Sequence, residues 1–407
     1  NALIHALEKR AGCPDEFWNQ IETHFGTSGF LIGISSIFWR ESWKYGERAF
    51  RYCNHDAGHA LAALSISANL FGWKVTYLNG LSDENIENIL GFNAAGYPEF
   101  EKEHPDFLCF VHPYQANIPS RSLPDQTIRD LANAEFTGLP NQLSRGHVNW
   151  EIIYETARQT FKPATRDQNY KFGRRKWISQ SAGRYSASRI IRNRRSATSF
   201  DSSGSITKTQ LLSMLDKTLP RDNASPFDAE LAEPATHLFL FVHNVADLPA
   251  GLYFFIRNEA DAAEIRRMTK PDFLWRPVAD GFPLFLLEEG NFRRQAMMVS
   301  CHQEIAGYSA FSLGMIARFK SVIDREPFRY RHLFWETGMI GQVLYLEAEA
   351  HGVRGTGIGC FFDDAVHEIL GLKDNRFQSL YHFTVGKPIE DSRLTTYPPY
   401  HHLKMVP

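Results

Sequence analysis

Residues 50–91, FRYCNHDAGHALAALSISANLFGWKVTYLNGLSDENIENILG, can be laid without a gap on residues 330–371, YRHLFWETGMIGQVLYLEAEAHGVRGTGIGCFFDDAVHEILG. About ten of some forty aligned positions are identical. Chance agreement between two helices is a poor explanation, because the copies also share a glycine after the helix and the ending ILG. An internal repeat of this length indicates that one structural unit is used twice.

Each copy predicts the same series of elements. A helix is expected to begin at Asp56 or Glu336, because a carboxylate suits the positive end of a helix, and to end at Gly72 or Gly352. The helix is apolar on more than one face, so we expect it to be buried. A short extended piece follows, and then a capped helix and a strand. The caps are Ser82-Asp83 and Asp363-Asp364, and the strands are 107–113 and 380–388.

The second copy has a front half that the first copy lacks. Its pattern predicts two helices, the second with Thr207 as its cap, and two strands rich in aromatic and branched residues. These elements are SASRIIRN (186–193), TKTQLLSMLDK (207–217), HLFLFVHNV (237–245) and GLYFFIRN (251–258). The first copy is therefore expected to be incomplete at its N-terminal side.

The composition excludes several classes of protein. The chain has 407 residues, 43% of them hydrophobic, and a net charge of −2. This balance indicates a folded protein without the basic excess of a nucleic-acid binder. No apolar run reaches the length of a membrane span, and the first residues lack the order of a signal peptide. We therefore expect a cytoplasmic protein that binds neither nucleic acid nor membrane.

The cysteines favour a reducing compartment. They are odd in number, scattered and without a CxxC pair. We expect no disulfide framework and no zinc site. The five are Cys13, Cys53, Cys109, Cys301 and Cys360.

A basic turn in the second copy suits a phosphate group. Arg194 and Arg195 offer forks of N–H donors that match phosphate oxygens, and Ser196 adds a short hydroxyl donor. Taken alone, the same residues could equally be a solvated basic turn. The wider pattern of the second copy favours the phosphate site.

The second copy resembles the flavin-dependent nitroreductase family. RRSATSFD, IGCFFDDAVHEILGL and YHFTVGKPIEDSRL occur in that family's order and spacing. The resemblance implies that the cofactor is FMN and that the Arg-Arg-Ser turn and a tail cation grip its phosphate. It also implies that the backbone at the GIGCF step lies close to the flavin ring. The implied cofactor-binding residues are Arg194, Arg195, Ser196, Thr198, Ile358, Gly359, Cys360, Lys387 and Arg393.

The first copy resembles a narrower branch, the SagB-type azoline dehydrogenases with tandem domains. The segment IFWRESWKYGERAFRYCNHDAGHA (37–60) carries this resemblance, and the catalytic pair of the branch maps to Lys44 and Tyr45. Oxidation of an azoline requires the loss of a proton and a hydride. A lysine withdrawn from water can take the proton, and a tyrosine can hold or relay it. A packed tyrosine beside an exposed lysine is the structural alternative.

Several residues depart from the family pattern. Thr198 stands where the family often has a basic residue, and the loop at 225–236 lacks the expected sequence over the flavin. Glu230 and Glu233 in this loop would place negative charge near the flavin. The Lys-Tyr pair is not repeated in the second copy, so we expect one asymmetric site or a partly degenerate one.

The predicted architecture is α+β. It has two nitroreductase-like units, each with an antiparallel sheet flanked by helices, which form an intramolecular pseudo-dimer through helices 56–71 and 336–351. The expected segments are a first unit at 1–115, a connecting segment at 116–180 and a second unit at 181–407.

The expected function is FMN-dependent oxidation of azoline-like heterocycles in a modified peptide, with a peptide or small heterocyclic substrate and no metal. Other biosynthetic enzymes are possible partners, and the protein is expected to be a monomeric pseudo-dimer or a homodimer. An NAD(P)H-dependent nitro or quinone reductase and a non-catalytic scaffold subunit are the alternatives.

Overall fold

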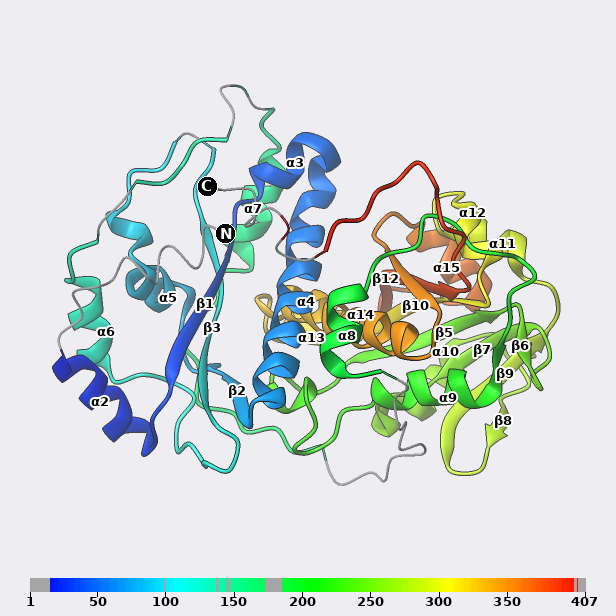
Figure 1. The fold of residues 1–407 in the computed structure, drawn as a ribbon, viewed down its shortest axis with the longest axis horizontal. Coiled ribbons are helices and arrows are strands. Elements are labelled where there is room, and N and C mark those ends of the chain that lie inside the picture. Colours follow the sequence, from blue (N-terminus) through cyan, green and yellow to red (C-terminus); the bar gives the residue numbers. More distant parts are fainter. Residues whose placement is uncertain are drawn as a thin grey trace. The chain divides into compact units, whose positions relative to one another are not determined.

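The computed structural model describes residues 15–98, 100–136, 139–143, 146, 148–172, 185–398 and 401. The chain divides into two compact units, which are coloured by sequence in Figure 1. Unit 1 contains residues 1–174, 221–233 and 322–339, and unit 2 contains residues 175–220, 234–321 and 340–407. Two segments that we expected in the second unit, 221–233 and 322–339, therefore group with the first.

Unit 1 is built on a three-stranded antiparallel sheet. The strand order is β1-β3-β2, with β1 at Phe30–Ser36, β3 at His104–Pro113 and β2 at Trp73–Tyr77. Its helices are α2 (Asp15–Phe25), α3 (Trp39–Tyr45), α4 (Ala49–Leu70), α5 (Asp83–Leu90), α6 (Asp125–Ala132), α7 (Glu151–Gln159) and α13 (Lys320–Arg325), of which α13 lies mostly in this unit. Helix α14 (Arg329–Ala350) contributes its first residues to unit 1 and its remainder to unit 2.

Unit 2 is built on a seven-stranded sheet whose order is β11-β12-β10-β5-β7-β9-β8. Every described neighbour pair in this sheet is antiparallel. The strands are β5 (Thr236–Val242), β7 (Gly251–Phe255), β8 (Arg276–Ala279), β9 (Phe282–Glu289), β10 (Phe311–Arg318), β11 (Arg354–Ile358) and β12 (Phe377–Gly386). A separate short parallel pair joins β4 (Ile206–Thr207) to β6 (Val245–Ala246).

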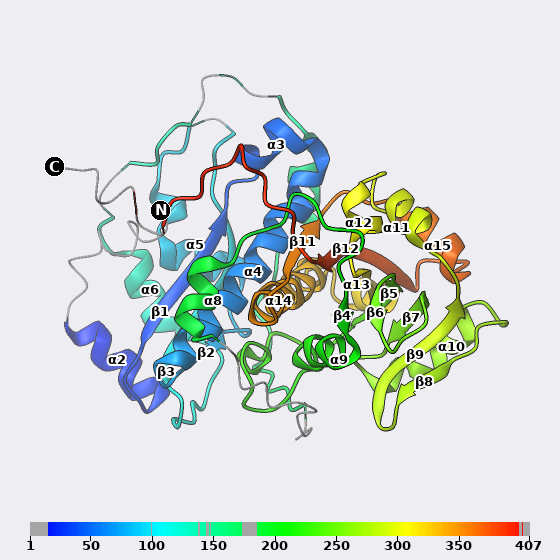
Figure 2. The same ribbon diagram turned by 45° about the vertical axis from the view of Figure 1, so that its right-hand side comes forward.

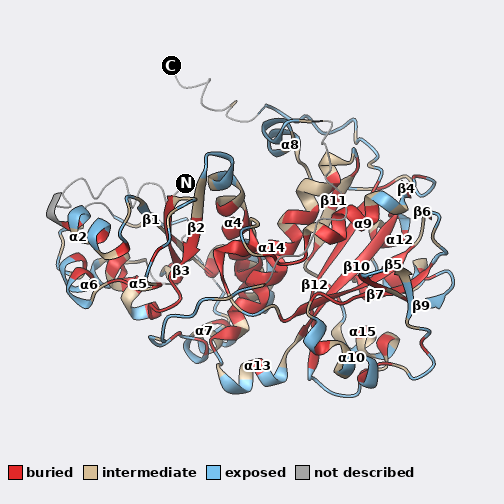
Figure 3. Cartoon of the chain, turned by 90° about the horizontal axis from the view of Figure 1, so that it is seen from below, coloured by how far each residue is buried: buried red, intermediate tan, exposed pale blue. Residues whose placement is uncertain are grey.

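The helices of unit 2 complete its core. They are α8 (Ala187–Asn193), α9 (Lys208–Lys217), α10 (Ala262–Met268), α11 (Arg293–Val299), α12 (Glu304–Tyr308) and α15 (Asp363–Leu370). Side chains from α10, α11 and α15 pack on aromatic residues of β5 and β7. Figure 2 shows α11 and α12 side by side, and Figure 3 shows the buried strands of the sheet in red. In the described part of the chain, no helix is both long and apolar enough to cross a membrane.

The internal repeat is confirmed by the topology. The order β1-β3-β2 in unit 1 matches β10-β12-β11 in unit 2, and both α4 and α14 are 22 residues long. The register shift between Ile34 and Ser35 in β1 recurs between Met315 and Ile316 in β10. The four strands β5, β7, β8 and β9 have no counterpart among the described residues of unit 1, as the missing front half of the first copy predicts.

The predicted ends of the long helices are correct, but their predicted beginnings are wrong. Helices α4 and α14 begin at Ala49 and Arg329, seven residues before the expected carboxylates. The first turn of α4 is held by burial, because Phe50 belongs to an apolar cluster with Phe38. Packing of this kind can start a helix without a cap. The glycines after both helices have the expected left-handed backbone, with φ of +75° at Gly72 and +74° at Gly352.

The short helices confirm most of the predicted capping. Ser82 forms a reciprocal capping box with Asn85, and Thr207 forms the same box with Gln210. In the second copy, Phe362 takes the cap position before Asp363 and provides no capping hydrogen bond from its side chain.

The two repeat helices pack directly on each other, as predicted. Within unit 1, a Cβ at Gly58 would lie 2.2 Å from the carbonyl oxygen of Trp335, and a Cβ at Gly338 would lie 2.2 Å from that of His55. These four residues are equivalent in pairs, since each repeat position differs by 280. The indole Nε1 of Trp335 also donates a 2.8 Å hydrogen bond to Asn54. The contact is therefore reciprocal and depends on glycine at both crossing positions.

The segment expected to connect the units is largely part of unit 1. Helix α6 contributes Ile128 and Leu131 to one apolar cluster, and α7 contributes Ile153 to another. The contribution of this segment to the core of unit 1 was not predicted, because its sequence is mostly polar and only one face of each short helix is buried. Trp177 of this segment lies outside the described residues.

Candidate functional site

The basic turn of unit 2 is fixed to the edge strand of the sheet. It follows α8 at Arg194, and Ala197 lies beside β11. The amide of Ala197 donates to the carbonyl of Gly355 at 3.4 Å, and the hydroxyl of Thr356 donates to the carbonyl of Ala197 at 2.8 Å. Glycine is required at 355 by side-chain packing, because a Cβ there would lie 2.6 Å from the ring of Phe383 in β12.

Tyr345 of α14 holds the same turn from the other side. Its hydroxyl lies 3.0 Å from the hydroxyl of Ser196 and accepts a 2.8 Å hydrogen bond from the amide of Gly357. The guanidinium of Arg194 lies 4.9 Å from the centre of the Tyr345 ring. One aromatic side chain therefore positions both the cation and the hydroxyl that we predicted to bind phosphate.

The turn carries positive charge that no carboxylate neutralises within the described residues. Arg194 makes no ion pair there, and Arg195 donates only to the backbone carbonyls of Arg192 and Arg194. The side chain of Ser196 is exposed. Two guanidinium groups and a hydroxyl are thus available to an anion, so the donor set fits the phosphate of FMN.

The two predicted tail cations are placed differently. Lys387 forms a 3.1 Å ion pair with Asp201, and Arg393 forms a 2.7 Å ion pair with Asp391. Hydrogen bonds from Ser203 and then from Lys387 lower the pKa of Asp201 to about 2. The tail runs beside the segment that follows the turn, since the amide of Asp201 donates to the carbonyl of Lys387. Among the described residues, however, neither tail cation bonds to Arg194 or Ser196.

The remaining predicted flavin contacts lie on or near β11. Ile358 ends the strand and is buried in the core, whereas Gly359 is half-buried and Thr198 is exposed. Cys360 forms a disulfide with Cys301. The expectation of a chain without disulfides is therefore wrong at this pair, and the cysteines no longer favour a reducing compartment. The pair could not be predicted from local sequence, because its members are 59 residues apart.

Lys44 and Tyr45 lie together at the end of α3 in unit 1. The ammonium of Lys44 is 5.0 Å from the centre of the Tyr45 ring, and that ring meets Tyr52 edge to face at 4.8 Å. Both side chains are exposed. The pairing fits the predicted catalytic couple, but the withdrawal from water that we expected for the lysine is not present within unit 1. Its approach to a flavin on unit 2 stays a prediction.

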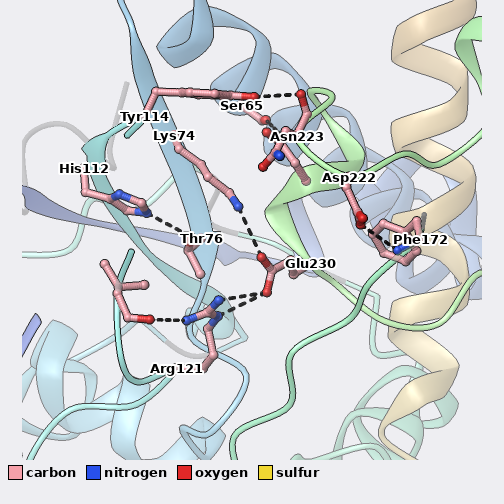
Figure 4. A network of polar contacts seen from close by, with 12 residues as sticks. Ser65, Lys74, Thr76, His112, Tyr114, Arg121, Phe172, Asp222, Asn223 and Glu230 are labelled. Carbon is pink, nitrogen blue, oxygen red and sulfur yellow. Dashed lines mark hydrogen bonds and ion pairs between the residues drawn. The ribbon is translucent and has the colours of Figure 1, made fainter. Parts of the chain in front are cut away.

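The acidic loop that we expected over the flavin belongs to unit 1. Glu230 accepts from Lys74 at 3.2 Å and from Arg121 at 2.9 Å, and all three side chains are largely buried (Figure 4). Glu233 groups with the same unit. The Glu230 carboxylate therefore neutralises two cations of its own unit. Its expected place near the flavin stays a prediction.

Sequence reasoning missed Tyr345 and the glycines of β11. Tyr345 stands opposite Ser65 in the repeat, so no match drew attention to it. The alternation of glycine in Arg354–Ile358 was a usable signal, because glycine inside a strand often marks the close approach of another group. The hydroxyl of Tyr381 would meet a Cβ at Gly357 at only 2.0 Å.

Comparison with protein families matches residues 191–387 to the Nitroreductase family. The matched range is slightly less than half of the chain and contains both the basic turn and β11. The crystal structure of a candidate nitroreductase from Anabaena variabilis aligns over 93% of this chain and 74% of that one, with a TM-score of 0.63 and 21% identity. The chain therefore has the nitroreductase fold, with mixed helices and antiparallel sheet, as predicted.

Two further structures align over little more than half of the chain. One is a candidate nitroreductase from Ralstonia eutropha, with 15% identity and a TM-score of 0.38 over 52% of this chain and 87% of that one. The other is the E. coli microcin synthetase McbBCD complex with truncated pro-MccB17 bound, with 18% identity and a TM-score of 0.36 over 58% of this chain and 87% of that one. Scores this low carry no structural conclusion. No curated protein matches the chain.

Proposed function

We propose that the protein is an FMN-dependent oxidoreductase that holds the cofactor's phosphate on the turn from Arg194 to Ser196. The observation that carries the proposal is a turn whose two arginines have no carboxylate partner in the described structure. Tyr345 contacts Arg194 and Ser196 of this turn and also bonds to β11. The family match supports it, because the matched range includes this turn. When bound, FMN supplies a hydride acceptor, which amino-acid side chains cannot provide. The residues at 358–360 are proposed to line its ring.

The preferred activity is that of a SagB-type dehydrogenase, which oxidises azoline-like heterocycles in a modified peptide. Lys44 is the proposed base for the ring proton, and Tyr45 holds or relays that proton. Since Lys44 is exposed, a peptide substrate would have to cover it to make it an effective base. Other biosynthetic enzymes that deliver such a peptide are the proposed partners.

Binding of FMN to the full chain, followed by flavin fluorescence, tests the cofactor proposal. Loss of a charge-assisted hydrogen bond costs about 1.5–3 kcal/mol, so Arg194→Ala should raise the Kd about 10- to 150-fold. Arg189→Ala is the matched control, since it removes a cation from α8 that stacks on Tyr185. Equal affinities for wild type and Arg194→Ala would contradict the proposal.

The variant Arg393→Ala tests whether the tail cation also binds the phosphate. A loss of FMN affinity would assign Arg393 to the phosphate. Unchanged affinity would mean that Arg393 stays paired with Asp391.

Flavin bleaching under anaerobic conditions tests the activity. Lys44→Ala and Lys44→Arg should both bind FMN normally and lose bleaching by an azoline-containing peptide, because a guanidinium cannot act as a base at neutral pH. Lys171→Ala, which removes an exposed lysine of the same unit, is the control. Rapid bleaching by NADPH without peptide would instead favour the nitro or quinone reductase. A chain that takes up no FMN would favour the scaffold.

A further inference from the structure

The disulfide of unit 2 lies in the loop that continues the edge strand β11. It joins Cys360, two residues after the strand, to Cys301, two residues after α11, with the Cα atoms 5.8 Å apart. Both cysteines are half-buried. The other described cysteines, Cys53 and Cys109, are buried thiols, and burial raises the pKa of both. Only the bonded pair is therefore placed for chemistry with a ligand, within the described chain.

The loop does not depend on the disulfide for its position. The amide of Phe362 donates to the carbonyl of Val299 at 2.9 Å, which already ties the same two segments together. The ring of Phe361 stacks on the buried ring of His382, with centres 4.6 Å apart. The hydroxyl of Ser300 lies 3.1 Å from Nδ1 of the same histidine. A hydrogen bond and packing thus hold both sides, and a covalent staple is not needed to place them.

The backbone at the first cysteine is strained. Cys301 has φ of +53° and His302 has φ of +58°, although neither is glycine. Left-handed backbone at such residues is unfavourable and is concentrated at functional sites. This backbone conformation is the second feature, after partial exposure, that separates the pair from a structural crosslink.

The disulfide also lies close along the chain to the proposed cofactor site. The amide of Gly357 and the hydroxyl of Ser196 meet at the same tyrosine hydroxyl, that of Tyr345. Cys360 follows Gly357 by three residues, which span at most about 10 Å. A cofactor held by its phosphate at Ser196 and lying along β11 therefore has the disulfide within its reach.

We propose that the Cys301–Cys360 disulfide is redox-active and accepts electrons from the reduced flavin, an inference that rests on the proposed function. The S–S bond breaks, the two sulfurs take up two electrons and two protons, and FMN returns to its oxidised form. The resulting dithiol is reoxidised in two exchange steps by a low-molecular-weight disulfide, which leaves as two thiols. The pair thereby supplies the electron acceptor that a dehydrogenase needs after each turnover.

Anaerobic reductive titration of the FMN-loaded full chain tests the proposal. Wild type should take up four electrons per bound FMN, two for the flavin and two for the disulfide. Cys301→Ser, which leaves the residues proposed to line the flavin ring unchanged, should take up two. Cys53→Ala, which removes a buried thiol, should still take up four. Alkylation and mass spectrometry after the titration should find Cys301 and Cys360 modified in wild type. The same treatment of apo protein should leave them bonded.

The outcomes separate this proposal from the cofactor assignment. If FMN binds but uptake stops at two electrons with the disulfide intact, the bond is structural and the redox proposal is overturned. Reduction of the disulfide in apo protein at the same rate would also overturn it, because the flavin would play no part. If no FMN binds, the proposed function itself fails. Retained FMN binding by Cys301→Ser shows that this variant folds, so a loss of electron uptake cannot be due to unfolding.

Discussion

The two copies of the repeat cover their edge strands with different segments. In unit 2, Tyr345 of α14 contacts Ser196 in the basic turn beside β11. In unit 1, Ser65 stands at the equivalent position of α4, and its hydroxyl lies 2.9 Å from that of Ser225. The same helix position therefore anchors a basic turn in one unit and an acidic loop in the other.

The different covering segments also change how the cations on the two edge strands are neutralised. Lys74 of β2 and Arg354 of β11 are equivalent residues, and each pairs with a glutamate. The partner of Lys74 is buried Glu230, whereas the partner of Arg354 is Glu390, whose side chain is 73% exposed. In unit 1 the acidic loop neutralises its cations, and in unit 2 the turn at Arg194 stays unneutralised in the described structure. We therefore expect one FMN per chain, bound to unit 2.

Removal of the two glutamates should have very different effects. Glu230→Ala leaves Arg121 and Lys74 buried without their shared partner, which should lower the free energy of unfolding by about 3–5 kcal/mol. Glu390→Ala breaks an exposed pair and should cost less than about 1 kcal/mol. Urea denaturation of both variants measures the difference. Similar losses would mean that the two pairs are equivalent and that the comparison between the units is wrong.

A buried carboxyl in β3 should make the stability depend on pH. Burial raises the pKa of Asp106 to about 7, although Ser36 and Arg331 favour its ionised form. The folded chain thus keeps a proton that the unfolded chain releases near pH 4, so stability falls as pH rises from about 4 to 7 and stays low above that. The second copy has apolar Leu380 at the corresponding bulge position.

Asp106→Asn removes this titration and keeps an acceptor for Ser36. The variant should gain about 2–4 kcal/mol over wild type at pH 8 and little at pH 4, as measured by denaturation at several pH values. Asp130→Asn, an exposed change in α6, is the control and should show no such trend. A constant difference between Asp106→Asn and wild type across this range would show that Asp106 is ionised throughout.

The helix crossing should tolerate no side chain at either glycine. Gly58→Ala and Gly338→Ala each place a methyl group against backbone, and each should lower the free energy of unfolding by about 1–3 kcal/mol despite the better helix propensity of alanine. The two losses should be similar, because the contact is reciprocal. Gly96→Ala, with open space around it, is the control. Thermal unfolding that shows a stabilised Gly58→Ala would contradict the close crossing.

Local sequence was sufficient wherever short-range chemistry decides the structure. The repeat, the capping boxes at Ser82 and Thr207, and the glycines that end both long helices could all be predicted, because each depends on residues a few positions apart. The helix beginnings could not, since burial of Phe50 outweighed the preference for a carboxylate at the first turn. The chemical type of the turn at Arg194–Ser196 was also evident, because guanidinium and hydroxyl groups are phosphate donors in any fold.

The environment of that turn was decided only by the tertiary structure. Tyr345 is 149 positions from Ser196, Cys301 is 59 from Cys360, and Glu230 is 156 from Lys74, so no local pattern links the members of these pairs. Whether a charge is free or neutralised depends on which distant segment packs beside it. The sequence by itself determined the repeated unit and its candidate donors. The fold determined that Glu230 neutralises the cations of unit 1, while Arg194 of unit 2 pairs with no carboxylate in the described residues and is available to an anion.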